Sequence, residues 1–294
     1  MTIPIWNLDD TGVCRSVAPD TAGSLAEAAE TEPPNGVYLV ARTYDGLQVL
    51  DLDGHMDRME RSARTLGRQL EIPRAAVRRR VRELADELAS RRPLGQGAGG
   101  QGAGGELRFR LTAVLDEPRW YRLAAEPVRE LPASLLEQGA VCCLSAGWER
   151  RDPTVKSTGW MATRRALQGD CYEHLLTRDD GTILEGATSN FYAVIGDRLR
   201  TAGEGVLEGM ARRVVMEVAG RLAPPLPLDL RAPTVAELES GRVTEACISS
   251  ATRGVVPVCR IGEVELGRPG PRTRALRAAY GEWLRDHLEP LVSR

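Results

Sequence analysis

A single lysine, Lys156, stands out in a chain that uses arginine for almost every other basic side chain. The 294 residues contain 39 lysines and arginines together, and Lys156 is the only lysine among them. Arginine stays protonated in proteins, whereas a lysine amine whose pKa is lowered can become neutral and attack a carbonyl carbon. We therefore take Lys156 as the candidate nucleophile, and a stray surface lysine is the alternative.

The segments that must position this lysine have the patterns of both helices and strands. Two β-rich runs within 36–52 flank Asp45-Gly46, which is a hairpin signal, and residues 106–115 alternate as a strand does. Helical spacing or helix signals occur at 55–67, at 74–90, after Gly209 and at 274–288. Further short strands are expected at 139–145, 171–177 and 190–195. Because strands and helices do not alternate regularly, we predict an α+β fold rather than a doubly wound parallel sheet.

Composition excludes several other classes of protein. A net charge of −2 gives no broad electrostatic case for nucleic acid as a partner. No apolar run approaches the roughly 20 residues that span a membrane, and the N-terminus lacks the basic and apolar regions of a signal peptide. The chain is therefore expected to be cytoplasmic, with no membrane partner.

Cysteine and histidine are sparse and scattered. The six cysteines lack zinc-type spacing, so we interpret them as small buried thiols in a reducing compartment. The three histidines, His55, His174 and His287, are isolated in the sequence and are interpreted as structural residues. No metal site is predicted.

Five stretches of the chain, taken in order, carry a resemblance to a known family. They are GVYLVARTY and HMDRMERSA within 36–63, VKSTGWMATRRAL at 155–167, ILEGATSNFYAV at 183–194, VLEGMARRVVMEVA at 206–219 and EACISSATRGVVPV at 245–258. In this order and spacing they resemble the class IV, or fold type IV, pyridoxal-phosphate enzymes. That family includes branched-chain aminotransferases, D-amino acid aminotransferases and aminodeoxychorismate lyase.

The resemblance implies a two-domain enzyme with pyridoxal 5'-phosphate held between the domains, and a homodimer. The segment 126–138 has prolines and no strong pattern, so it is interpreted as the interdomain linker. A small N-terminal α/β domain is then expected over 1–125 and a larger C-terminal cofactor-binding domain over 139–294. The glycine-rich residues 95–105 match no phosphate-binding loop and are interpreted as a flexible connector.

The resemblance also implies roles for three charged residues. Lys156 matches the Schiff-base lysine, which would bind the cofactor aldehyde and then move the Cα proton of the substrate. Glu185 matches the glutamate that pairs with the pyridine nitrogen, and Arg58 matches the arginine that binds the phosphate. A surface carboxylate is the alternative for Glu185, and one more solvated arginine is the alternative for Arg58.

Backbone groups and small side chains would complete the phosphate site. Gly209, Met210 and Ala211 open a predicted helix whose N–H groups can bind phosphate. The family uses a small hydroxyl residue where this chain has Ala251, so the hydroxyl would come from Ser250 or Thr252, and the choice stays open.

The match departs from the family pattern near the substrate. Branched-chain enzymes carry a tyrosine where this chain has Met161, and a proline stands where a tyrosine usually precedes the GVY strand. Candidate substrate-binding residues are the strand arginines, as a carboxylate clamp, and two aromatic residues: Arg108, Arg110, Tyr38 and Trp160. The arginines could instead pair with Glu106 or face solvent, and the aromatic residues could be core.

These observations favour an aminotransferase that moves an amino group between an amino acid and a 2-oxo acid. The alternative is a lyase of the aminodeoxychorismate type, which uses the same cofactor and eliminates pyruvate. The amino donor, its chirality and the pathway stay open.

Overall fold

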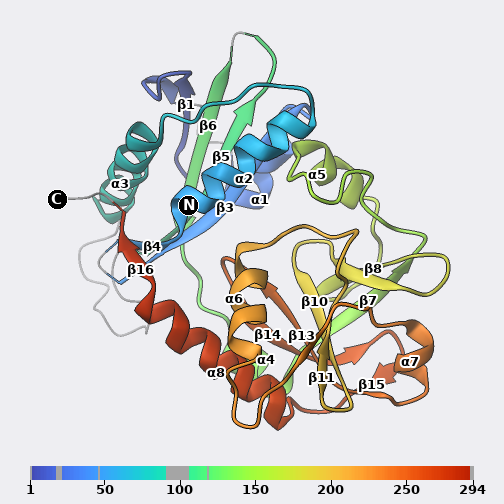
Figure 1. The fold of residues 1–294 in the computed structure, drawn as a ribbon. Coiled ribbons are helices and arrows are strands. Elements are labelled where there is room, and N and C mark those ends of the chain that lie inside the picture. Colours follow the sequence, from blue (N-terminus) through green and yellow to red (C-terminus); the bar gives the residue numbers. More distant parts are fainter. Residues whose placement is uncertain (1, 18–21, 46, 91–105, 118, 292–294) are drawn as a thin grey trace. The chain divides into compact units, whose positions relative to one another are not determined.

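The computed structural model describes residues 2–17, 22–45, 47–90, 106–117 and 119–291. It divides into two compact units. Unit 1 comprises residues 1–130, 155–163 and 287–294, and unit 2 comprises 131–154 and 164–286 (Figure 1). The predicted connector at 95–105 and the turn residue Gly46 lie outside the described residues.

Unit 1 is built on a seven-stranded sheet in the order β16-β4-β3-β5-β6-β1-β2. Its strands are β1 (Ile5–Asp9), β2 (Cys14–Val17), β3 (Gly36–Tyr44), β4 (Gln48–Leu50), β5 (Leu107–Val114), β6 (Trp120–Pro127) and β16 (Leu288–Pro290). All neighbouring strands pair antiparallel. The pairing of β3 with β4 is the hairpin that the sequence predicted around residues 45 and 46.

Helices cover both faces of this sheet, because alternate residues of each strand point to opposite faces. Phe109 and Leu111 pack with α2 (Leu52–Thr65) and α3 (Arg74–Ser90) in the main core. On the other face, α1 (Leu25–Glu30) packs against β1 and β6, and Tyr38 packs with Met161 of α5 (Thr158–Arg164). The strand that carries Arg110 is therefore buried on both sides.

Unit 2 contains a nine-stranded sheet in which β9 also pairs with β10. Its strands are β7 (Ala140–Ala146), β8 (Glu173–Thr177), β9 (Ile183–Gly186), β10 (Asn190–Ile195), β11 (Arg198–Arg200), β12 (Leu228–Asp229), β13 (Val243–Ser250), β14 (Gly254–Ile261) and β15 (Val264–Glu265). Six of them close into a ring in the order β10-β13-β14-β7-β8-β9. The ring closes at the pairing of Asn190 with Glu185.

Four helices belong to unit 2: α4 (Ala133–Gln138), α6 (Met210–Ala219), α7 (Val235–Glu239) and α8 (Pro271–Asp286). Helices α6 and α8 pack on each other and on β13 and β14. Among the described residues, no helix has both the length and the apolar character needed to cross a bilayer.

The α+β prediction is confirmed, and the predicted helix at 74–90 has the bounds of α3. The units differ from the predicted domains in three places. Residues 133–138 of the expected linker form α4, residues 155–163 belong to unit 1, and the chain returns to unit 1 at residue 287. The segment with the single lysine therefore belongs to the N-terminal sheet rather than to the C-terminal domain.

Candidate active site

In unit 1, Lys156 lies in an extended segment that is anchored to strand β3. Its carbonyl oxygen accepts a hydrogen bond from the N–H of Tyr38 at 3.0 Å, and the next residue, Ser157, bridges to Val37. The N–H of Lys156 donates to Oγ of Ser62 on α2 at 3.2 Å. The backbone on both sides of the lysine is therefore fixed, and its side chain extends from a defined position.

Helix α2 presents a buried polar stripe toward this segment. It begins after Asp51, whose carboxylate accepts from the N–H of Gly54 at 3.0 Å and so caps the helix. His55, Arg58 and Ser62 follow at spacings of three and four residues, which puts them on one helix face, and all three are buried. The Arg58 guanidinium lies 3.4 Å from Nδ1 of His55. Arg58 thus shares a helix face with the residue that contacts the Lys156 backbone.

Tyr38 connects Lys156 to a buried ion pair. Nζ of Lys156 lies 5.1 Å from the centroid of the Tyr38 ring, and the guanidinium carbon of Arg110 lies 3.6 Å from the same centroid. Arg110 binds Glu32 through two hydrogen bonds of 2.8 and 2.5 Å, and both side chains are 3% exposed. Burial alone lowers the pKa of Arg110, but the hydrogen bonds and charge of Glu32 outweigh it, so the pKa lies above its ordinary value.

The two arginines predicted as a carboxylate clamp are both paired with acidic residues of the chain. Arg108 pairs with Glu126, and Arg110 pairs with Glu32, whereas Glu106 pairs with Arg42. None of these partners was anticipated, because each pairing depends on which strands and loops meet. The clamp is therefore not supported. The fourth candidate, Trp160, is buried at 7% exposure on α5.

In unit 2, Glu185 is held at the point where the strand ring closes. One carboxylate oxygen accepts from the side-chain amide of Asn190 at 3.2 Å and from the backbone N–H of Leu207 at 3.1 Å. The other oxygen lies 3.0 Å from Nε of Arg150. The Glu185 residue is only 1% exposed, so the alternative of a surface carboxylate is wrong.

The start of helix α6 lies beside this carboxylate. Asn190 also donates to the carbonyl oxygen of Leu207 at 2.8 Å, which confirms the prediction that it holds its loop. Gly209 is the N-cap of α6, and a Cβ there would lie 2.3 Å from Oδ1 of Asn190, so only glycine fits. Met210 and Ala211 follow in the first turn, where backbone N–H groups lack partners within the helix and can bind an anion.

The turn between β13 and β14 is tied to the loop between β9 and β10. Ser249 pairs with Asn190 in the sheet, and Ser250 Oγ accepts from Nε of Arg253 at 2.9 Å. Arg253 also donates to Oγ1 of Thr188 at 2.7 Å and to the buried carboxylate of Glu173 at 3.2 Å. Burial lowers the pKa of Arg253, but Glu173 raises it further, so the guanidinium stays charged. Ala251 and Thr252 lie in the same turn, both partly exposed.

Sequence reasoning missed Arg150, which pairs with Glu185 and donates to the carbonyl oxygen of Ala187 at 3.3 Å. It is 7% exposed. One arginine among 38 carries no signal of its own, and only its place six residues before Lys156 could have drawn attention to it. Arg253 was missed for the same reason.

Comparison with known proteins decides the family. A family model described as amino-transferase class IV matches residues 36–261, which is most of the chain. The chain belongs to the class IV aminotransferase family. Enzymes of this family depend on pyridoxal phosphate.

Named relatives of this class IV aminotransferase agree with the assignment. A D-alanine aminotransferase from Bacillus licheniformis is 27% identical over 264 residues, covering 83% of this chain and 86% of the relative. The branched-chain amino acid aminotransferase of Escherichia coli has a TM-score of 0.73 at 19% identity, covering 99% of this chain and 100% of the other. The branched-chain amino acid aminotransferase of T.th., solved with pyridoxamine 5'-phosphate, has a TM-score of 0.75 at 19% identity and covers 99% of each chain.

These relatives confirm two of the predictions, the fold type IV architecture and the aminotransferase activity. The protein is a pyridoxal-phosphate-dependent aminotransferase. No observation favours the lyase alternative.

Proposed function

We propose that this aminotransferase binds pyridoxal phosphate with Lys156 and Arg58 of unit 1, and with Glu185 and the start of α6 of unit 2. Two features of the site support the fit. A fixed backbone presents the single lysine amine of the sequence next to a buried arginine on α2. A buried carboxylate in unit 2 lies beside a helix start where Gly209 leaves no side chain in the way.

The phosphate would be bound by the Arg58 guanidinium and by backbone N–H groups of Met210 and Ala211. Ser250 is one candidate hydroxyl and is already oriented by Arg253, while Thr252 is the other. When bound, the cofactor supplies a covalent attachment for the substrate amine and a ring that withdraws electrons from Cα.

Each remaining step is carried by a residue of this chain. The Lys156 amine, once released from the cofactor, removes the proton from the substrate Cα and returns it on the other side of the transfer. Glu185 keeps its negative charge directed at the pyridine nitrogen because Arg150, Asn190 and Leu207 fix both of its oxygens. A carboxylate held in place before the reaction stabilises the ring N–H without having to reorganise.

The surroundings of Lys156 support an amino donor with an apolar side chain. Tyr38 packs with Ala29 and Met161 in an apolar cluster, and its ring faces the Lys156 amine. The nearest buried cation in this part of unit 1, Arg110, is neutralised by Glu32. A carboxylate on the donor side chain would therefore find no uncompensated positive charge at this cluster. The substrates named for the relatives, D-alanine and branched-chain amino acids, belong to the same chemical class.

A half-reaction screen tests the proposal. The purified holoenzyme is mixed with single amino acids, and loss of cofactor colour is followed together with release of the matching 2-oxo acid. Alanine, valine and leucine, each in the D and the L form, are compared with aspartate and glutamate. We expect at least one apolar donor to react and acidic donors to react more slowly. Faster reaction with an acidic donor would refute the substrate class, and no reaction with any donor would refute the aminotransferase site.

The homodimer is part of the same proposal, since the family resemblance implies that two copies assemble. Light scattering on the purified holoenzyme tests it directly. A mass of about one chain at working concentration would contradict it.

A further inference from the structure

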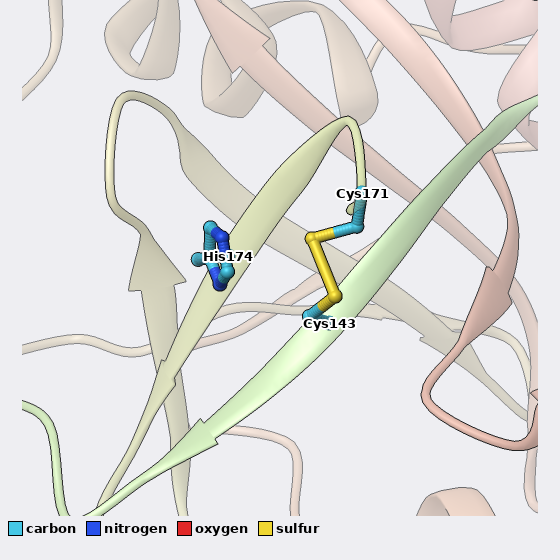
Figure 2. A group of neighbouring side chains, drawn as sticks. All are labelled: Cys143, Cys171 and His174. Atoms are coloured by element: carbon cyan, nitrogen blue, oxygen red, sulfur yellow. A yellow bond between two sulfur atoms is a disulfide. The ribbon is translucent and has the colours of Figure 1, made fainter. Parts of the chain in front are cut away.

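Three potential metal ligands gather on one side of the strand ring in unit 2, outside the residues assigned to the cofactor. Cys143 lies on β7, His174 lies on the parallel neighbour β8, and the two are direct partners in the pairing register. Cys171 precedes His174 by three residues and forms a disulfide with Cys143, with Cα atoms 6.0 Å apart (Figure 2). The interpretation of these two cysteines as free buried thiols was therefore wrong, and His174 is not isolated.

The strand pairing itself brings the three side chains together. Sγ of each cysteine and a ring nitrogen of His174 all lie within 4.8 Å of one another. Residues in register on parallel strands point to the same face of the sheet, so Cys143 and His174 would stay neighbours if the disulfide were opened. All three residues are partly exposed, so that an ion from solvent can reach them.

Two features around the cluster suit a bound cation. Oγ of Ser145 lies 3.1 Å from Nδ1 of His174, which can fix the ring orientation and leave the other nitrogen for a ligand bond. The backbone of Gly169 passes close to the cluster, and a Cβ there would lie 3.1 Å from Sγ of Cys143 and 3.7 Å from Cε1 of His174. Glycine at this position leaves open the space beside the sulfur.

We propose that the reduced protein binds one thiophilic divalent cation, of which Zn²⁺ is the model, through Cys143, Cys171 and His174. Two thiolates and one imidazole are a known ligand set for zinc, with a fourth position open to water. The disulfide and the cation use the same two sulfur atoms, so each excludes the other. The cluster is thus a cation site controlled by thiol oxidation, and it is separate from the amino-transfer residues.

The chemistry balances with a phosphine as the reductant. The phosphine gives two electrons to the disulfide and becomes a phosphine oxide with an oxygen atom from water, while the two sulfur atoms gain two protons. Cation binding then deprotonates both thiols and releases two protons. Re-oxidation by a small-molecule disulfide removes two electrons from the thiolates, re-forms the Cys143–Cys171 bond and frees the cation.

Zinc binding to the full-length holoenzyme tests the proposal. One sample is reduced with a phosphine and desalted without oxygen, and a second is left oxidised. Reduction should raise the free thiols from four to six per chain. Both samples are then titrated with Zn²⁺ in competition with a coloured chelator. We expect one equivalent of Zn²⁺ per chain in the reduced sample and none in the oxidised sample.

Variants separate this site from adventitious binding. Cys171→Ser and His174→Asn should each weaken zinc binding roughly a hundredfold or more, and Ser145→Ala about tenfold, as for a group that orients a ligand. Cys259→Ser and His287→Asn remove a thiol and an imidazole elsewhere and should leave binding unchanged. The proposal is overturned if the reduced wild type binds no zinc, if the oxidised sample binds as well as the reduced one, or if His174→Asn keeps full affinity.

Discussion

Replacing Glu32 with glutamine removes the negative charge from an ion pair that solvent barely reaches. Glu32 accepts two hydrogen bonds from Arg110 and a third from Oγ1 of Thr112 at 2.6 Å, and both members of the pair are 3% exposed. Glutamine has nearly the same shape, so packing changes little. The Arg110 guanidinium is left buried with its charge uncompensated.

The expected loss of stability is large because burial, rather than the contact alone, sets its size. Removing one partner of a buried pair costs about 3–5 kcal/mol, whereas an exposed pair contributes about 0–1 kcal/mol. For a protein of this length each kcal/mol lowers Tm by roughly 2–4 °C. Glu32→Gln should therefore lower Tm by roughly 6–12 °C or more. Replacing both members, as in Glu32→Gln with Arg110→Met, removes the stranded charge and should recover part of that loss.

Thermal unfolding of the holoenzyme, followed by circular dichroism, measures this effect. The matched control is Glu117→Gln, because Glu117 pairs with Arg119 on the surface with side chains 69% and 36% exposed. The control should change Tm by no more than about 2 °C. A second readout is the donor preference, since Arg110 freed of Glu32 should bind acidic donors better and lower their KM. Unchanged stability in Glu32→Gln, or a double variant less stable than the single one, would refute the reasoning.

Two further substitutions test the cofactor contacts. Glu185→Gln should lower the single-turnover rate of the cofactor-saturated enzyme roughly 10²–10³-fold, because an amide cannot stabilise the ring N–H as a carboxylate does. The exposed control Glu204→Gln should react normally, and an unchanged rate in Glu185→Gln would remove Glu185 from the role. Arg58→Ala should raise the Kd for pyridoxal phosphate roughly tenfold to a hundredfold, with partial rescue by Arg58→Lys. Arg61→Ala, on the exposed side of the same helix, should retain its cofactor on dialysis, and equal retention by Arg58→Ala would make Arg58 a structural arginine.

Features that depend on neighbouring residues in the sequence were predictable. Helix α3 repeats apolar residues at helical spacing over 74–90, and strand β10 at 190–195 is a compact apolar run, so both were predicted with their correct bounds. The helix after Gly209 was expected because a glycine N-cap precedes an amphipathic segment.

Features that depend on pairing between distant segments were not predictable. Glu32 and Arg110 are 78 residues apart, and nothing local indicates that their loop and strand meet. Cys143 and His174 come together only because β7 and β8 are parallel neighbours, which their spacing does not reveal. The segment around Lys156 joins unit 1 through pairing with β3, although the chain on both sides of it belongs to unit 2.

Reductive trapping tests the central claim most directly, which is that Lys156 is the residue that carries the cofactor. Borohydride treatment of the holoenzyme converts the bond between the amine and the cofactor aldehyde into a stable one, and peptide mass mapping then locates it. Because Lys156 is the only lysine, the only other amine that can react is the N-terminal α-amino group. We predict one cofactor per chain on the peptide that contains Lys156 and none in Lys156→Arg. Cofactor found on the N-terminal peptide, or absent from the Lys156 peptide of a coloured and active enzyme, would contradict the account.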